Sequence, residues 1–545
     1  MKNQTNGEKE GLYYTYSKIP LKPFYCGEDI SEIHSTVGKP GEYPFTRGLY
    51  KTGYRKFSWN QRQLTGFGLA GDTRARQEFL FKSGQKGYGD DAALTVLFDS
   101  PTQYGHDSDD PIAKGAVGGC GVAVDTLKDV EDLFQGMPLD QVSIGMIIEG
   151  PATVLLAMLI AAAENQGISR DKLRGGITNN SLLNSYCCKN SVFPSSKLLR
   201  VVVDLIEFCS KEMPQWNSIQ FSGYNFSEIG AIPAQEIAFT LATASAVVES
   251  CLERGLKVEA FASRFMFLMK MTLNIFEEIA KFRAGRKMWA QIMKNKFGAT
   301  DKRSLFFRIL SYTAGSDLTA QEPLNNIARV SLMGLASVLA GVQSLYLTPY
   351  DEALGLPTKT SQRVSLKIHK ILEHEMNLTH VADPLGGSYY LEYLTSEIEK
   401  QAQKYLVEIE ELGGLIPAIE SGYMEREATK RMLQIQKDID SGKKIVVGMN
   451  KFVEEGAPDL IHAHTHYSEK ERVAVEKLKA IKNTRDNLKV NFCLQNVRKA
   501  AECADNLMYP IIEAVKAYAT IGEIMGVLRE VFGELKDIPI LADSA

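Results

Sequence analysis

Short apolar segments alternate with helical patterns along most of this chain, and this alternation limits the possible folds more than any other feature. Between the segments, apolar residues recur at three- and four-residue spacing, which is typical of helices with one buried face. Continuous apolar strands that alternate with helices indicate a parallel sheet, and eight repeats predict a closed α/β barrel, the (β/α)8 or TIM barrel. The eight predicted strands are 93–99, 120–125, 142–148, 175–180, 218–224, 258–264, 305–312 and 344–350.

The barrel is expected to span residues 91–395, between two extensions. Residues 1–90 are rich in Tyr and Gly and form an extended N-terminal segment in this interpretation. Residues 396–545 are predicted to be a helical extension with one short strand at 445–452. No long Pro/Ser-rich linker separates the parts, so both extensions should pack on the barrel. The loops that follow the strands should carry the function, because TIM barrels place their active sites on that face.

Composition excludes several classes of protein. The formal net charge of −4 and the pI near 6.2 provide no basic surface for nucleic acid. No apolar run free of charge is long enough to span a bilayer, and the first 20 residues lack a hydrophobic signal core, which predicts a cytoplasmic protein. The 8 cysteines show no metal-binding spacing, although Cys187 and Cys188 are adjacent. His462, His464 and His466 could bind a metal, but they lie in a polar segment rich in Lys and Glu, and we predict no metal site.

The sequence contains no nucleophile elbow, P-loop or zinc signature. It does contain a series of longer motifs, in order from about residue 40 to the C-terminus. They are "YPFTRGLYKTGY", "FDSPTQYGHDSDDP", "AVGGCGVAVDT", "FSGYNFSEIGA", "IFEEIAKFRAGRKMWA", "SDLTAQEPLNNIAR", "YDEALGLPT", "VADPLGGSYYLEYLT" and "NLMYPIIEAVKAYATIGEI". Together these motifs resemble the large, substrate-binding subunit of the cobalamin-dependent acyl-CoA mutases, the methylmalonyl-CoA and isobutyryl-CoA mutase family.

The resemblance implies a TIM barrel with acyl-CoA along its axis and a radical rearrangement of the acyl carbon skeleton that starts from adenosylcobalamin. The family's corrinoid-binding module has the signature Asp-x-His-x-x-Gly, and none of the 8 histidines here lies in that pattern. The resemblance therefore implies a separate small cobalamin-binding subunit as partner, with a homodimer of large subunits inside a heterotetramer. The alternative is a chain that binds no corrinoid at all.

On the coenzyme A side, the resemblance assigns Tyr50, Thr52 and Arg264 to contacts with CoA, and residues 1–90 would begin the CoA site and form subunit contacts. A guanidinium suits phosphate because it offers paired donors. Phe57 stands where the family has a further CoA-contacting arginine. The remaining assigned positions line the substrate channel or face the cofactor, and they are Thr95, Phe98, Gln343 and, toward the corrinoid, Glu352.

The acyl end of the inferred pocket departs from the methylmalonyl pattern. Leu64 replaces a tyrosine that wedges over the substrate, and Lys189 replaces an arginine that pairs with the substrate carboxylate. A cation at position 189 favours a carboxylate-bearing acyl group, whereas a solvated surface lysine is the alternative. Further exchanged wall positions are Gly145, Ile147, Met266, Thr178, Leu310 and Tyr312.

Asn225 falls on the family histidine that hydrogen-bonds the thioester carbonyl, next to Tyr224. Asparagine keeps one neutral donor but cannot transfer a proton. These exchanges predict an intramolecular transferase for an acyl group bulkier or more apolar than methylmalonyl, with Asn225 and Tyr224 at the thioester, Lys189 at any carboxylate and Leu64 shaping the space below the corrinoid. The alternative is a non-catalytic paralogue that serves as a structural subunit of a mutase complex.

Overall fold

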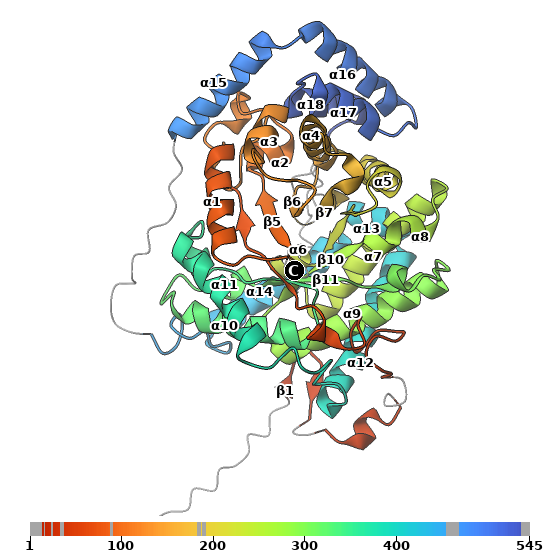
Figure 1. Ribbon diagram of the computed structural model, residues 1–545. Coiled ribbons are helices and arrows are strands. Elements are labelled where there is room, and N and C mark those ends of the chain that lie inside the picture. The colour runs from red at the N-terminus through yellow and green to blue at the C-terminus, as the bar shows by residue number, and fades with distance from the viewer. Residues whose placement is uncertain are drawn as a thin grey trace, which may run out of the picture.

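A ring of parallel strands forms the centre of the molecule in the computed structural model (Figure 1), which describes residues 13–15, 17–22, 25–32, 37–87, 91–182, 187, 192–453 and 468–535. The strands belong to two five-stranded sheets, with the orders β4-β5-β6-β7-β8 and β3-β12-β11-β10-β9. Their bounds are β3 (Asn60–Gln61), β4 (Leu64–Thr65), β5 (Ala92–Leu97), β6 (Val142–Ile147), β7 (Arg174–Ile177), β8 (Trp216–Asn217), β9 (Gln220–Ser222), β10 (Met266–Met271), β11 (Ile309–Thr313) and β12 (Ser344–Tyr346).

Two chain segments join the sheets into one barrel. Residues 60–65 contribute β3 to one sheet and β4 to the other, and residues 216–222 contribute β8 and β9 in the same way. All pairings within the two sheets are parallel, for example Leu64 with Thr95 and Phe267 with Ile309. The backbone N–H of Gln220 donates to the carbonyl of Thr178 at 2.9 Å and links the two sheets at the second corner. The eight segments therefore form the predicted α/β barrel.

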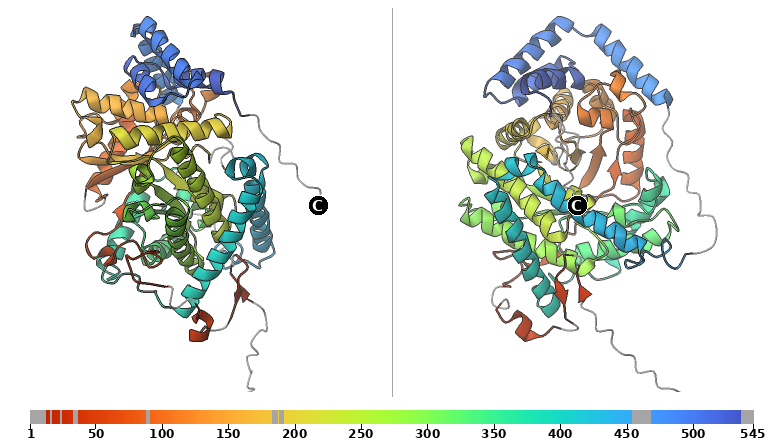
Figure 2. Two further views of the ribbon diagram at one scale, coloured as in Figure 1. Left: turned by 90° about the vertical axis from the view of Figure 1, so that its right-hand side faces the viewer. Right: turned by 180° about the vertical axis from the view of Figure 1, so that it is seen from behind.

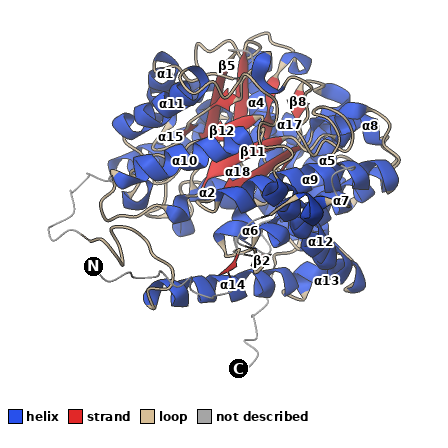
Figure 3. Ribbon diagram, turned by 90° about the horizontal axis from the view of Figure 1, so that it is seen from below, coloured by secondary structure: helices blue, strands red, loops and turns tan. Residues whose placement is uncertain are grey.

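Helices surround the strands on the outside (Figure 3). The most buried of them is α4, in which every residue from Ala152 to Ala163 is buried, because the C-terminal helix α17 covers its outer face. The helices up to the end of the barrel are α1 (Ala70–Lys82), α2 (Ser100–Tyr104), α3 (Leu127–Leu133), α4 (Ala152–Asn165), α5 (Ser195–Glu212), α6 (Tyr224–Glu228), α7 (Pro233–Glu253), α8 (Val258–Phe261), α9 (Ile275–Asn295), α10 (Asn325–Leu339) and α11 (Lys359–His374).

The C-terminal helices pack on two sides of the barrel (Figure 2). Helix α12 lies against α7 and α9, while α16, α17 and α18 form a group over α4 and α5. The bounds are α12 (Tyr389–Glu411), α13 (Leu415–Glu420), α14 (Tyr423–Asp440), α15 (Ser468–Thr484), α16 (Asn487–Glu502), α17 (Met508–Lys516) and α18 (Ile521–Phe532). The N-terminal segment adds a small antiparallel pair, β1 (Tyr13–Tyr14) and β2 (Pro20–Leu21). Among the described residues, no helix is long and apolar enough to cross a membrane.

Three of the predicted strands are wrong. Residues 258–264 form α8 and a 3-10 turn, because the buried residues Val258, Phe261, Ala262 and Phe265 recur with helical spacing, and the strand begins only at Met266. Residues 120–125 form a loop with one isolated bridge from Val122 to Phe98. Residues 445–452 contain only the isolated bridge between Val447 and Lys451.

A glycine explains why residues 120–125 form a loop and not a strand. Gly121 has φ +109°, and a Cβ there would lie 2.2 Å from the carbonyl carbon of Phe98. The chain can therefore turn away from β5 at this point only with glycine. Two barrel strands are missing from the prediction, β10 at 266–271 and the segment 60–65, whose two ladders are only two residues long each.

Candidate active site

A cavity of 370 Å³ runs inside the barrel and is lined by residues of both sheets. Seven residues that the sequence predicted for the site line this cavity, namely Leu64, Thr95, Gly145, Ile147, Thr178, Arg264 and Tyr312. Two exchanged wall positions, Met266 and Leu310, line it as well. The inward row of β6 shows how a strand builds the wall, since Ser143, Gly145 and Ile147 alternate with the more deeply buried Val142, Ile144 and Met146.

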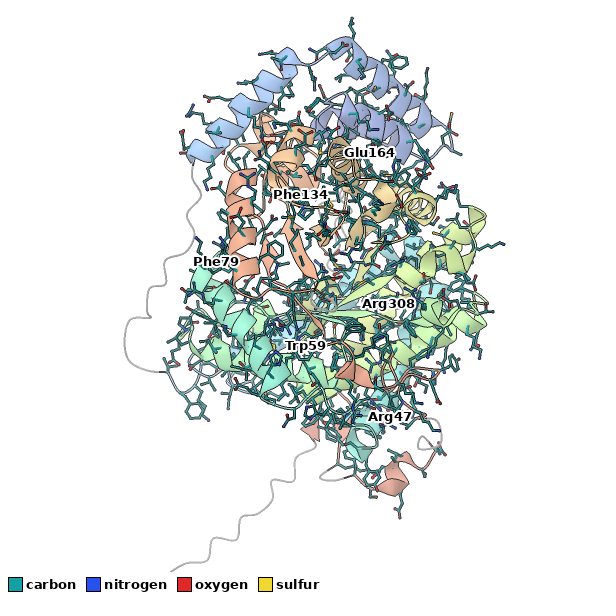
Figure 4. The ribbon with its side chains drawn as sticks, viewed as in Figure 1. Arg47, Trp59, Phe79, Phe134, Glu164 and Arg308 are labelled. Carbon is teal, nitrogen blue, oxygen red and sulfur yellow. The ribbon has the colours of Figure 1, made fainter. Side chains whose placement is uncertain are left out.

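The end of the barrel at the strand N-termini is basic. Arg264 precedes β10 and Arg308 precedes β11, and burial together with the charge of Arg303 lowers the pKa of both guanidinium groups, that of Arg308 to about 10. Arg308, which is labelled in Figure 4, donates one hydrogen bond to the carbonyl of Ser263, and the nearby Tyr50 acts on its pKa in the opposite direction. Among the described residues, no carboxylate forms an ion pair with Arg264 or Arg308. This end of the barrel therefore suits an anionic group such as phosphate.

Arg62 is a further cation, placed between β3 and β4 and pointing into the cavity. Its Nη2 donates to Ser143 Oγ at 2.8 Å, while its buried Nε has no hydrogen-bond partner. Burial lowers the pKa of this guanidinium to about 10, and no described carboxylate pairs with it. A Cβ on Gly145 would lie 3.4 Å from Arg62 Nη1 and 3.0 Å from Thr95 Oγ1, so glycine leaves space for the arginine. An unpaired buried guanidinium with a free donor is ready for a ligand acceptor.

Aromatic and aliphatic side chains form the wall of the cavity above Arg62. Tyr312 lies between Tyr224 and Tyr346, with ring centroids 5.6 Å and 4.7 Å away respectively. Leu64, Leu268 and Leu310 complete this apolar cluster, which is separate from the main core. The arrangement provides an apolar compartment on the side of Arg62 that faces the C-terminal ends of the strands.

Asn225 and Tyr224 open helix α6 directly after β9. The hydroxyl of Ser222 donates to Asn225 Oδ1, so the side-chain carbonyl is held by its own turn. Lys270 fixes the end of the same helix, because its Nζ lies 2.9 Å from Glu228 Oε1 and 2.8 Å from Ser316 Oγ. Burial, followed by the charge of Glu228, raises the pKa of Tyr224, which therefore remains a neutral hydroxyl.

Two acidic groups stand at the end of the barrel formed by the strand C-termini. Glu352 follows β12 at the mouth, where partial enclosure, then Asp351 and Glu228, raise the pKa of its carboxyl to about 7. Glu149 follows β6, and burial raises the pKa of its carboxyl to about 7. The charge of Glu352 also acts on Tyr346. The barrel is thus basic at one end and acidic at the other.

Other predicted site residues lie outside the cavity. Phe98 is 1% exposed and packs in the main core. Gln343 accepts from the N–H of Ile309 and donates to the carbonyl of Gly341, so its amide is occupied at the strand N-termini. Tyr50 and Gln343 border a smaller crevice, and Thr52 is exposed before a 3-10 turn at Gly53–Arg55. Lys189, Cys188 and the three histidines of "HAHTH" lie outside the described residues, and Cys187 is partly buried.

Sequence reasoning missed Arg62, Arg308 and Glu149. Each stands within two residues of the end of a strand, on the inward side, and a charged residue at such a position is a signal that could have been used. The prediction for Arg62 failed because β3 and β4 are so short, and Glu149 lies beyond the apolar run that defines β6.

The mouth offers no described histidine as a ligand for a metal. His369 is buried, with a pKa lowered to about 3 by burial, and accepts from Trp59 Nε1, while His106 is bound to Asp110 beside α18. Among the described residues, no group of three or more His, Cys, Asp or Glu side chains could hold a metal ion. A cobalt-containing cofactor at the mouth would be held, on the side of the described residues, by carboxyl and aromatic groups such as Glu352 and Tyr346.

Comparison with known proteins agrees with this geometry. The family model described as methylmalonyl-CoA mutase matches residues 14–534. The chain is 37% identical to the large subunit of 2-hydroxyisobutanoyl-CoA mutase from Aquincola tertiaricarbonis over 98% of its own length and 94% of that subunit. It is 38% identical to methylmalonyl-CoA mutase of Rhizobium meliloti over 97% of this chain and 74% of the relative, and 37% identical to the human mitochondrial enzyme over 98% and 71% respectively. This protein belongs to the methylmalonyl-CoA mutase family, whose members are cobalamin-dependent, and it is a CoA mutase, an intramolecular transferase.

Proposed function

We propose that this chain is the substrate-binding subunit of an adenosylcobalamin-dependent mutase that isomerises an acyl-CoA bulkier or more apolar than methylmalonyl-CoA. The observation that carries the proposal is the cavity itself, which leads from unpaired arginines to an apolar compartment ringed by tyrosines. A CoA thioester has the same order of properties, with phosphates at one end and the acyl group at the other.

The basic end supports the binding of the CoA phosphates. Arg264 and Arg308 can each offer paired donors to a phosphate, and neither is neutralised by a described carboxylate. Arg62 lies further along the cavity, where its free Nε can donate to a carbonyl of the pantetheine arm or of the thioester. A bound ligand that displaces water from this part of the cavity would make each such hydrogen bond stronger than at the surface.

The apolar end supports a larger acyl group. Leu64, Ile147 and Leu310 provide aliphatic walls, and the hydroxyls of Tyr224 and Tyr312 stay protonated because burial raises their pKa. Asn225 retains an amide donor that could reach the thioester oxygen without transferring a proton. Lys189 lies outside the described residues, and its contact with a substrate carboxylate is a proposal from the sequence alone.

Adenosylcobalamin, when bound, supplies the organic radical that begins the rearrangement. The residues of this chain would hold the acyl group in one orientation and keep water from it, which is the protein's main contribution to such chemistry. Glu352 at the mouth would accept a hydrogen bond from the cofactor. The match to 94% of a large subunit supports a separate small subunit that carries the corrinoid.

The test combines the purified chain with its cobalamin-binding small subunit and adenosylcobalamin, and offers a panel of acyl-CoA esters of increasing size. We expect isomerised product from a branched ester with at least four acyl carbons, and slower turnover of methylmalonyl-CoA. The variant Leu64→Tyr should shift the preference toward smaller esters, because it fills the apolar compartment.

Binding and turnover separate the alternatives. Acyl-CoA binding without product from any ester would favour the non-catalytic paralogue. A chain that binds no CoA ester in calorimetry would contradict the proposal altogether. Glu253→Leu, an exposed change at the end of α7, is the control for general effects of substitution.

A further inference from the structure

Lys270 is a buried lysine on the inward face of strand β10. Met266 and Leu268 precede it on the same face, where Met266 lines the cavity and Leu268 belongs to the apolar cluster. The residues between them face the opposite way, into the main core. Lys270 is 4% exposed and takes the last inward position of the strand, on the side of the mouth. A lysine needs a reason to be there, because a buried charge is tolerated only where it is paired and hydrogen-bonded.

All three protons of the Lys270 ammonium group have acceptors. Its Nζ lies 2.9 Å from Glu228 Oε1 and donates to the carbonyl of Ser227 at 3.3 Å, and both residues end helix α6, which follows β9. The third acceptor is Ser316 Oγ at 2.8 Å, in the 3-10 turn Gly315–Asp317 that follows β11. Lys270 therefore ties together the segments that follow two strands on either side of its own. No donor is left for a ligand.

The backbone of Lys270 is held by the buried ion pairs of the neighbouring helices. Its N–H donates to Glu236 Oε1 at 2.9 Å, and its carbonyl accepts from Lys281 Nζ at 2.6 Å. Glu236 and Lys281 are fully buried and pair with each other at 2.7 Å. Lys270 cannot shift without disturbing this pair, so its side chain starts from a fixed point.

Helix α6 depends on such contacts because it is only 5 residues long and its N-cap, Gly223, offers no side-chain cap. Isolated helices of this length are unstable, and a lysine that donates to the last carbonyls is one way to hold them. Tyr224, the first residue of the helix, packs against the apolar cluster. Its ring centroid is 5.6 Å from that of Tyr312, which lines the cavity. The support of this part of the cavity wall therefore comes from α6.

We infer that Lys270 is a positioning residue, which holds α6 in place so that Tyr224 supports the ring of Tyr312 against the acyl group. This inference rests on the proposed function, since it assumes that the acyl group of a CoA ester occupies the apolar compartment. Without Lys270, Tyr224 can move away from Tyr312, and the compartment loses the close packing that distinguishes one acyl group from another. The CoA end of the cavity, at the strand N-termini, is not affected.

The test measures affinity by calorimetry, with the chain in its complex with the small subunit, and compares acetyl-CoA with isobutanoyl-CoA. The wild-type chain should bind isobutanoyl-CoA roughly 10-fold more tightly, because two further methyl groups are buried. Lys270→Met should reduce this ratio of affinities to about 2-fold, while the affinity for acetyl-CoA changes by less than about 3-fold. Lys270→Arg keeps a cation with several donors and should retain a ratio of about 5-fold or more.

Glu228→Ala removes the same contact from its partly exposed side, and it tests the role even if Lys270→Met does not fold. It should also lower the ratio to about 2-fold, and the double variant should lower it no further, because the two side chains act through one contact. Lys287→Met on α9 is the matched control, since its pair with Glu399 is partly exposed, and it should keep the ratio of the wild-type chain. Circular dichroism checks that each variant is folded.

Each outcome separates this inference from the proposed function. If the wild-type chain prefers isobutanoyl-CoA and both Lys270→Met and Glu228→Ala keep that preference, the role of Lys270 is wrong and the proposed function stands. Equal weakening of both esters by Lys270→Met would make Lys270 a purely structural residue, and additive losses in the double variant would contradict a shared contact. If the wild-type chain binds both esters equally, the acyl group does not reach the compartment and this inference fails. If neither ester binds, both proposals fail.

Discussion

Two sets of buried cations lie in this barrel, and they differ in how their charge is balanced. Lys281 on α9 is fully buried, and its Nζ contacts Glu236 at 2.7 Å and also Glu278. Arg283, two residues further along the same helix, pairs with Asp383 and Glu392. Arg62, Arg264 and Arg308 have no such partners among the described residues.

Arg286 shows that lack of a carboxylate alone does not define a binding residue. Like Arg62, it has a pKa lowered to about 10 by burial. Its Nε, Nη1 and Nη2 nevertheless all donate to backbone carbonyls, those of Phe45, Ala340 and Thr46. Arg62 has a buried Nε with no acceptor. The comparison teaches that an unused donor and the lack of a carboxylate partner must occur together, as they do at Arg62, because Arg283 also has a buried Nε without an acceptor but is paired with two carboxylates.

A substitution in the buried ion network of Lys281, Glu236 and Glu278 should have the largest effect on stability. Lys281→Met leaves Glu236 and Glu278 buried without their cation, and we expect a loss of about 3–5 kcal/mol in the free energy of unfolding. Urea unfolding measures this loss. Lys287→Met on the same helix is the matched control, because its pair with Glu399 is partly exposed and should contribute less than about 1 kcal/mol. Equal losses in both variants would contradict the distinction between sealed and surface pairs.

The pair Arg286→Met and Arg62→Met tests the role of unused donors directly. Arg286→Met removes donors from three carbonyls and should lower the free energy of unfolding by about 2–3 kcal/mol. Arg62→Met relieves an unsatisfied buried charge and should leave stability unchanged or raise it, while acyl-CoA affinity falls roughly 10-fold. Urea unfolding and calorimetry provide the two readouts. A stable Arg62→Met variant with unchanged affinity would remove Arg62 from the binding site.

The basic end can be tested by shortening the ligand. Arg308→Leu should weaken acyl-CoA roughly 10-fold, but leave the affinity for the acyl-pantetheine, which lacks the nucleotide, within about 2-fold. Competition binding compares the two ligands. Arg363→Leu, an exposed arginine on α11, serves as the control and should affect neither ligand. Equal weakening of both ligands would place Arg308 near the acyl end instead.

The carboxylate of Glu373, which pairs with Lys86, should show the smallest effect on stability when it is changed. Burial opposes ionisation of Glu373, but hydrogen bonds from Ser58, Lys86 and Gln61 outweigh it and lower its pKa to about 2. The folded value lies below the unfolded one of about 4.5, so the stabilisation is present above pH 4.5 and is lost as the pH falls toward 2. After allowance for solvent screening, Glu373→Gln should reduce stability by about 1 kcal/mol at pH 7 and by less at pH 4. Urea unfolding at both pH values checks this, and an equal loss at both would contradict the linkage.

The sequence predicted the barrel well where a strand is long enough to show a continuous apolar run. Strands β5 and β6 are 6 residues each and were located within a residue or two. The prediction failed at 258–264, where four apolar residues with helical spacing can be mistaken for a strand when the segment is short. It also failed at 60–65, because ladders of 2 residues carry no periodicity.

The wall positions inferred from the family resemblance mostly line the cavity, while the positions of Phe98 and Gln343 do not. Both lie in motifs that resemble the family, but a motif does not indicate in which direction a side chain points. Phe98 faces the core, and the amide of Gln343 is occupied by backbone groups.

The sequence by itself determined the family, the alternation of strands and helices where the strands are long, and the set of aliphatic residues at the acyl end, because these follow from local patterns and from motif order. Only the tertiary structure decided which cations are free. The sequence does not show that a donor of Arg62 lacks an acceptor while the donors of Arg286 all have one. The difference arises from acceptors contributed by distant parts of the chain, which folding brings to Arg286 and not to Arg62.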